Sequence, residues 1–319
     1  MGFLDTLTSM IPLAMFFAAP LIFTAIGGVF SERSGVVNIG LEGLMVMGAF
    51  VGVVFNIFFA DTFGAATPWI SILVAAIVSS LFSIIHAVAS ITFRADHVVS
   101  GVAINFLALG LGLFLTKQWF GRGQTGSISE PFYTTTVPFL SDIPIIGPIL
   151  FQKWFLTSYV AIIVAVLAWF VLFKTPFGLR LRSVGEHPMA ADTNGINVNR
   201  IRYIGVMISG FMGGLGGSVY ALTIAHEFSH STIVGQGFMS LAAVIFGKWH
   251  PLGAMGAAIF FGFAQSLAVV STSIPFLENV PSVFITIAPY LLTILALTGF
   301  IGRATPPKAL GTSYVKGSR

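Results

Sequence analysis

The segment His226–His230 reads His-Glu-Phe-Ser-His and matches the H-E-x-x-H motif of zinc proteases letter for letter. On a helix, this spacing places two imidazoles on one face to bind zinc, with the glutamate as general base. A catalytic site also needs a third protein ligand, and the apolar runs that follow contain no aspartate. The segment runs into Ser231, Thr232 and Gly235, where a helix is expected to end. We therefore favour a loop at the mouth of a membrane passage and predict no metal site; an intramembrane zinc protease is the alternative.

Five polar side chains lie inside runs that are otherwise apolar: Asn38, Glu42, His86, Asn105 and Gln265. Asn38 and Glu42 are four residues apart, so a helix would place them on one face. Ionisable groups within membrane spans are costly and usually face the bundle interior or a watery path. The five residues are therefore candidates to line a substrate path. Two structural alternatives stay open: Glu42 could pin neighbouring helices near the inner surface, and the uncharged side chains could hydrogen-bond between helices.

One apolar run is rich in glycine and contains two small-xxx-small pairs, Gly210 with Gly214 and Gly213 with Gly217. Such pairs let two helices approach closely, and no strand precedes them, so helix packing is favoured over nucleotide binding. No G-x-x-x-x-G-K-[ST] sequence occurs, because Gly247-Lys248 is followed by Trp249. The chain therefore cannot hydrolyse ATP through a P-loop of its own.

Hydrophobic residues make up 56% of the 319 residues and charged residues only 8%. Typical soluble domains carry about 25% charged residues, so the composition indicates an integral membrane protein. The absence of cysteine excludes disulfides, thiol catalysis and thiolate metal sites. Apolar runs of about 20 residues predict an all-α polytopic fold with about nine (8–10) transmembrane helices. The expected spans are Met10–Phe30, Val37–Ala60, Trp69–Phe93, Val98–Thr116, Leu156–Phe173, Ile204–Ala225, Ile233–Gly247, Leu252–Thr272 and Val283–Ile301.

Positive charge in a membrane protein gathers in the loops that face the cytoplasm. If the basic loop 174–203 lies inside, alternation places twelve Lys and Arg residues inside and three outside, the latter in the loop 117–155. This topology makes 117–155 an extracellular loop, puts the C-terminus in the cytoplasm and the N-terminus outside. The first span has no basic n-region or cleavage site, so we expect it to be retained. The net charge of +4 thus reflects topology, and no nucleic acid partner is expected.

Two runs in the chain resemble each other, Val37-x-x-Gly40-Leu41-x-Gly43-Leu44 and Val234-x-x-Gly237-Phe238-x-Ser240-Leu241. In the expected topology they cross the membrane in opposite directions, as inverted repeats of transporters do. Chance matches between apolar segments are the alternative. No separate soluble domain is indicated, so residues 1–319 are expected to form a single transmembrane domain.

The loop 174–203 contains a patterned core that solvent exposure alone does not require. It reads Gly185-Glu186-His187-Pro188-Met189-Ala190-Ala191, followed by Gly195. Because the loop is basic and is expected to face the cytoplasm, it is interpreted as a large docking loop for a cytoplasmic partner.

Three stretches, in order, resemble the motifs of the membrane subunits of ABC importers in the branched-chain amino acid and ribose permease superfamily. They are Glu32–Gly43, the loop core from Thr175 to Ile196, and Gly237–Gly253 with its Phe-Gly-Lys-Trp-His-Pro-Leu-Gly ending. The first and third resemble the nucleoside-uptake branch, and the resemblance covers nearly the whole chain. The chain is similar to the smaller of two permease subunits of nucleoside importers in Gram-positive bacteria.

The resemblance implies a multi-pass permease in the cell membrane that imports nucleosides, with purine nucleosides such as guanosine favoured. It implies that the loop docks on an ATPase through Gly178, Gly185, Glu186, Ala190, Ala191 and Gly195. The implied partners are a homologous second permease, a cytoplasmic tandem ABC ATPase, an extracellular substrate-binding lipoprotein, the nucleoside and membrane lipid. This chain would then be no enzyme and hold no cofactor. A sugar or a branched-chain amino acid is the alternative substrate.

A self-sufficient secondary transporter is a further alternative, and it would need sites for a coupling ion. The five polar residues inside the spans supply neither an ion-coordinating cluster nor a chain of carboxylates for proton relay. Ion pumping is therefore disfavoured.

Overall fold

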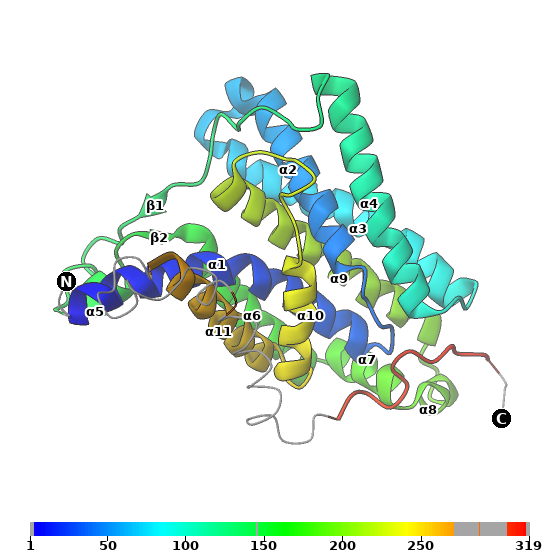
Figure 1. Ribbon diagram of the computed structural model, residues 1–319. Helices are drawn as coiled ribbons and strands as arrows, with labels where there is room; N and C mark the ends of the chain where they lie inside the picture. Colours follow the sequence, from blue (N-terminus) through cyan, green and yellow to red (C-terminus); the bar gives the residue numbers. More distant parts are fainter. Residues whose placement is uncertain (1–2, 145, 271–286, 288–304, 317–319) are drawn as a thin grey trace.

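The computed structural model describes residues 3–144, 146–270, 287 and 305–316. Most of these residues lie in helices, with one short two-stranded sheet (Figure 1). Five helical stretches in this part are long and apolar enough to cross a membrane: Met10–Arg33, Leu41–Thr92, His97–Phe120, Leu156–Lys174 and Val198–Ala225. The mostly helical, membrane-spanning character predicted from composition is confirmed.

The elements follow one another in this order: α1 (Phe3–Arg33), α2 (Leu41–Phe63), η1 (Gly64–Ala66), α3 (Thr67–Ala87), η2 (Val88–Thr92), α4 (His97–Phe120), β1 (Thr134–Thr135), α5 (Ile146–Leu150), β2 (Trp154–Phe155), α6 (Leu156–Lys174), α7 (Pro176–Glu186), α8 (Pro188–Thr193), α9 (Val198–Tyr220), η3 (Ala221–Ala225), α10 (Gln236–Phe246) and α11 (Pro251–Val270). The first eight expected spans each contain one long helix or, for α10, a short one. The ninth, Val283–Ile301, lies outside the described residues except for residue 287. With 11 residues, α10 is too short to cross a hydrocarbon core of about 30 Å.

Helices α1 and α9 form the centre of the bundle. Helix α1 packs against α9, α10, α11 and α6, while α9 also packs against α2 and α3. The glycine run of α9 makes these contacts close: a Cβ at Gly217 would lie 1.9 Å from the carbonyl oxygen of Met45, and one at Gly214 would lie 2.5 Å from the Cβ of Ser79. Side chains larger than hydrogen therefore cannot be accommodated there without separating α9 from α2 and α3.

The connections gather at two opposite ends of the bundle. At one end, the N–H of Thr125 donates to the carbonyl of Phe228, and the N–H of Ile128 donates to that of His226, both at 2.9 Å. These bonds join the 117–155 loop, which also holds the β1–β2 pair, to the connection before α10. At the other end lie α7, α8 and the segment 305–316 (Figure 1).

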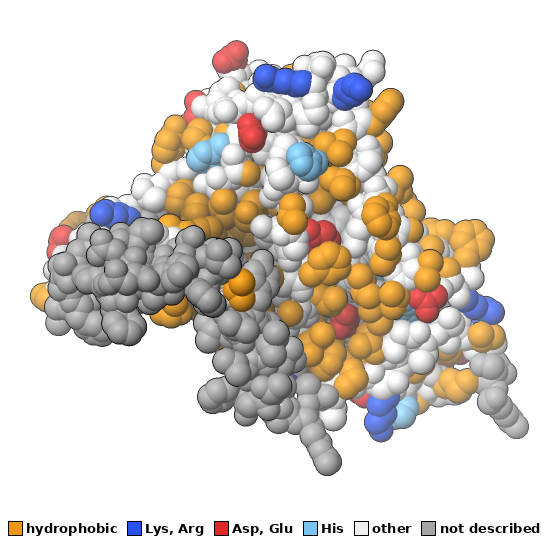
Figure 2. Space-filling view, viewed as in Figure 1, with side chains coloured by type: hydrophobic (Ala, Val, Ile, Leu, Met, Phe, Trp, Pro, Cys, Tyr) orange, Lys and Arg blue, Asp and Glu red, His pale blue; other side chains and the backbone are white. Residues whose placement is uncertain are grey.

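Large apolar side chains are exposed on the flanks of the bundle. Examples are Phe106 and Phe114 on α4, Leu81 on α3 and Ile163 on α6, each more than half exposed. Figure 2 shows hydrophobic side chains across the middle of one face, with Lys and Arg residues towards its ends. An exposed apolar surface of this kind suits contact with lipid or with another membrane subunit.

Candidate functional site

The loop 174–203 is a pair of helices bent back against the bundle. Thr175 begins α7, because its side chain accepts a hydrogen bond from the N–H of Gly178, and Pro176 fills the first helical position. Two glycines let α7 lie directly on its neighbours. A Cβ at Gly178 would lie 2.2 Å from the carbonyl oxygen of Val171, and one at Gly185 would lie 2.1 Å from that of Arg33. Both positions therefore require glycine for a close backbone approach.

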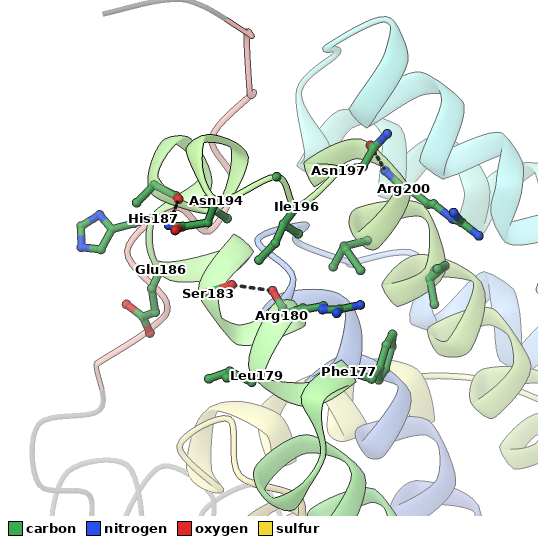
Figure 3. A pocket seen from close by; sticks show the side chains of 15 residues that line it. Phe177, Leu179, Arg180, Ser183, Glu186, His187, Asn194, Ile196, Asn197 and Arg200 are labelled. Atoms are coloured by element: carbon green, nitrogen blue, oxygen red, sulfur yellow. Dashed lines mark hydrogen bonds between the residues drawn. The ribbon is translucent and has the colours of Figure 1, made fainter.

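A hollow of about 1050 Å³ opens between α7, α8 and the start of α9 (Figure 3). Its lining combines apolar side chains such as Phe177 and Ile196 with the exposed cations Arg180 and Arg200. Asn197 caps α9 by accepting a hydrogen bond from the N–H of Arg200 at 3.0 Å. The hollow is large enough to receive a helix or loop of another protein, and its rim is basic.

Helix α8 stands at the edge of this hollow. Ala191 is buried at 4% exposure, whereas Ala190 is exposed. One face of this short helix therefore packs against the rest of the chain, and the opposite face is accessible to another protein. Gly195 has a φ of +79°, which favours glycine, and ends the turn after α8. Glu186 is half-exposed and lies 3.9 Å from the guanidinium of Arg33, so its carboxylate is already paired within the chain.

Residues from the three distant motifs meet beside this loop. The carboxylate of Glu32, buried at 3% exposure, accepts a hydrogen bond from the indole Nε1 of Trp249 at 2.5 Å. The Nε of Arg33 donates to the carbonyl of Trp249 at 2.8 Å, and Arg33 also reaches Glu186. The end of α1, the turn between α10 and α11 and the end of α7 are therefore tied together.

The segment 34–40 between α1 and α2 is not helical, although it is largely buried. Buried backbone outside a helix needs other hydrogen-bond partners for its polar groups. The Nδ1 of His97 accepts from the N–H of Val37 at 3.2 Å, and His86 lies with its Nε2 3.1 Å from the Val37 carbonyl. Asn105 donates to the carbonyl of Ile39 at 3.1 Å. Side chains of α3 and α4 thus supply hydrogen bonds to the non-helical segment 34–40.

Three of the five expected path residues belong to this cluster. His86 and Asn105 bond the interrupted backbone, and Asn38 donates to the hydroxyl of Ser209 at 2.9 Å. Asn105 also accepts from the N–H of Gly43 at 2.7 Å. Their polar atoms are largely engaged within the chain, although the Oδ1 of Asn38 is buried without a partner.

Glu42 bonds the start of the short helix α10. Its two carboxylate oxygens accept from the N–H groups of Gly235 at 2.5 Å and Gly237 at 2.6 Å. The similar runs 37–44 and 234–241 therefore meet at the starts of α2 and α10. A carboxylate is favoured at a helix N-terminus, where unpaired N–H groups carry partial positive charge. Gln265 lies apart from this junction and donates to the Sδ of Met239 at 3.5 Å.

The segment His226–His230 does not form a helix. His226 has a φ of +58°, and Phe228 is fully buried against Phe50, with ring centroids 5.3 Å apart. The two imidazoles therefore lack the shared helical face that zinc binding by this motif requires. Among the described residues, no group of three or more His, Cys, Asp or Glu side chains could hold a metal ion.

Residues 10–297 match the family of permease components of branched-chain amino acid transport systems. The chain belongs to this family. It is 62% identical, over the full length of both proteins, to the guanosine ABC transporter permease protein NupQ of Bacillus subtilis. It is 53% identical to the nucleoside ABC transporter permease protein NupC of Lactococcus lactis, over 99% of each chain. A second Bacillus subtilis protein, the guanosine ABC transporter permease protein NupP, is 25% identical over 88% of this chain and 79% of its own length.

The sequence did not indicate several residues that hold α1, the segment 34–40 and α7 together. No role is predicted from the sequence for His97 or for the segment 305–316, and Trp249 is included only within the third motif. Trp249 and Glu32 both belong to the motifs that resemble the nucleoside-uptake branch, and this was the one sequence feature that could have suggested a contact between them. His97 and the segment 305–316 gave no local signal.

Proposed function

We propose that the chain is a permease subunit of an ATP-binding cassette importer and forms the translocation path for nucleosides, with purine nucleosides such as guanosine favoured. The observation that carries this proposal is the full-length similarity to two proteins named as nucleoside or guanosine permeases. The subunit is no enzyme, because a separate ATPase hydrolyses ATP. Neither sugar uptake nor a zinc protease has comparable support.

We assign α8 and its flanks as the surface that docks on the ATPase. Ala190 is small and exposed, and Ala191 anchors the helix, while Gly178 and Gly185 hold α7 against the bundle. Glu186 connects the loop to Arg33 at the end of α1. Movement of a docked ATPase would therefore be transmitted through α7 to α1 rather than absorbed by a soft loop. Gly195 allows the turn that follows α8.

We place the substrate path beside the starts of α2 and α10, which meet through Glu42. Glu42 lies at this meeting point, whereas Asn38, His86 and Asn105 shape it by holding the segment 34–40. Gln265 would line the path further along α11. Short or discontinuous helices whose ends meet are a recurring feature of transporter binding sites. This placement fits an inverted repeat within a single domain of about nine helices.

The complete importer would contain a second, homologous permease, as the pair NupP and NupQ suggests. A cytoplasmic tandem ATPase and an extracellular substrate-binding lipoprotein would complete it in the cell membrane. The end that carries α7 and α8 is basic, so we orient it and the C-terminus towards the cytoplasm, with the 117–155 loop outside.

Uptake of radiolabelled guanosine tests the substrate. A strain deleted for this chain should lose uptake, and a plasmid copy should restore it. Unlabelled purine nucleosides should compete, whereas a branched-chain amino acid or a sugar should not. Competition by either of the latter, without competition by nucleosides, would overturn the substrate assignment.

A further inference from the structure

The segment 305–316, here called the C-terminal strap, runs across the end of the molecule that carries α7 and α8 (Figure 1). Its backbone bonds two separate elements: the N–H of Ala309 donates to the carbonyl of Gly185 at 2.9 Å, and the N–H of Gly311 donates to that of Gly35 at 3.0 Å. The first bond holds the end of α7. The second holds the start of the interrupted segment between α1 and α2.

The strap also covers a buried charge. Arg202 in α9 is only 1% exposed, and its Nη1 donates to the carbonyl of Thr312 at 2.9 Å. The Nε and Nη2 atoms of the same guanidinium are buried without a partner. Leaving a buried guanidinium without an acceptor costs free energy. The hydrogen bond from Arg202 to Thr312 therefore stabilises the position of the strap.

Helix α8 shares its surroundings with the strap. One hollow of about 470 Å³ has Met189 and Ala190 on one side and Ser313 and Tyr314 on the other. A second hollow of about 450 Å³ lies between the start of α9 and Tyr314 with Lys316. Asp192 of α8 lines this second hollow as well. A protein that embraces α8 would therefore touch the strap as well.

Positive side chains outnumber the carboxylates of Glu186 and Asp192 on this face. Lys308 and Lys316 of the strap are exposed, as are Arg180 and Arg200 around the hollow of α7 and α9. Positive side chains on both sides of α8 fit a partner whose surface is acidic around the groove that receives the helix.

We propose that the C-terminal strap is a second docking element for the ATPase, which together with α8 forms one basic contact surface. The inference rests on the proposed coupling role of α8. The strap also joins α7 to Gly35 through backbone hydrogen bonds. It would therefore connect the ATPase directly to the segment 34–40, which contains Asn38 and accepts a hydrogen bond from Asn105 of α4.

Single cysteines provide the test, because the natural chain contains none. We would introduce Met189→Cys in α8, Ser313→Cys in the strap and Arg122→Cys in the opposite loop, all at exposed positions. Maleimide labelling would be compared between the complete detergent-solubilised transporter and the same permeases purified without the ATPase. We expect the ATPase to slow labelling at 189 and 313 about tenfold, as occupancy near nine in ten requires, and to leave 122 unchanged.

The outcomes separate the two claims. Protection at 189 without protection at 313 would overturn the strap inference and leave the role of α8 standing. Protection at neither position would overturn both. As a second measurement, the double variant Lys308→Glu/Lys316→Glu should retain roughly tenfold less ATPase on purification, whereas Arg122→Glu should retain the wild-type amount. Full retention by the double variant would count against an electrostatic contact at the strap.

Discussion

The contact between Glu42 and the start of α10 gives the sharpest prediction about stability. Both carboxylate oxygens accept backbone N–H groups, at 2.5 and 2.6 Å, and the side chain is only 9% exposed. Glu42→Gln preserves the shape of the side chain but removes its charge. One of its two terminal atoms then becomes an NH₂ group, which faces an N–H donor of Gly235 or Gly237 and cannot accept from it.

The expected loss follows from these contacts. A hydrogen bond to a charged group contributes about 1.5–3 kcal/mol, and a buried donor left unpaired costs a similar amount. The favourable position of an anion at a helix N-terminus adds up to about 1 kcal/mol. We therefore expect Glu42→Gln to destabilise the fold by about 3 kcal/mol, which corresponds to a fall in Tm on the order of 5–10 °C.

Thermal unfolding of the purified protein in detergent, followed by tryptophan fluorescence, measures this shift. The matched control is Glu227→Gln, in the partly exposed loop before α10, which should change Tm by less than about 2 °C. If Glu42→Gln unfolds at the same temperature as the control, the carboxylate does not hold α10. The inference that Glu42 joins the starts of α2 and α10 would then be wrong.

Further substitutions test the packing, the motif junction and the metal question. Gly217→Ala should lower Tm, because the new Cβ would lie 1.9 Å from a backbone carbonyl of α2, whereas Gly110→Ala, in α4 with nothing within 4 Å, should leave Tm unchanged or raise it slightly. Equal effects at both sites would refute the close packing. Trp249→Phe removes the indole N–H that donates a hydrogen bond to Glu32, and should lower the free energy of unfolding by about 2 kcal/mol in a denaturant or thermal assay. An unchanged stability would refute that hydrogen bond. His230→Ala should alter neither uptake nor metal content by elemental analysis, and zinc bound by the wild type and lost in this variant would revive the protease alternative.

Much of the fold could be predicted because lipid imposes simple rules on a chain. Runs of about 20 apolar residues must be helices, since no water is present to bond an exposed backbone. The first eight expected spans accordingly contain α1 to α4, α6 and α9 to α11. The start of α9 lies earlier than the expected Ile204, because Asn197 caps the helix in front of Val198.

The contacts that hold the segment 34–40 and the end of α1 could not be predicted in the same way, because they join residues far apart in the sequence. Nothing local to His97 indicates that its Nδ1 accepts from Val37, 60 residues earlier. The bond between Trp249 and Glu32 spans 217 residues. Such pairs depend on how the helices pack, which hydropathy does not describe.

The segment His226–His230 matches the sequence of a zinc-binding motif but does not have the backbone geometry that the motif requires. The motif works only where residues four apart share a helical face. Here the backbone turns at His226, with a φ of +58°, and Phe228 fills a pocket in the core. The nearby Ser231, Thr232 and Gly235 were the sequence features that disfavoured a helix.

The most direct test of the central claim is ATP-dependent guanosine uptake by the reconstituted importer with and without a bulky charge on α8. Ala190→Arg places that charge at the exposed face of α8, and Ala95→Arg is the matched control at an exposed site in the turn before α4. Our account predicts that Ala190→Arg abolishes uptake while guanosine capture by the binding lipoprotein stays intact, and that Ala95→Arg transports normally. Normal uptake by Ala190→Arg, in a correctly inserted protein, would contradict the account.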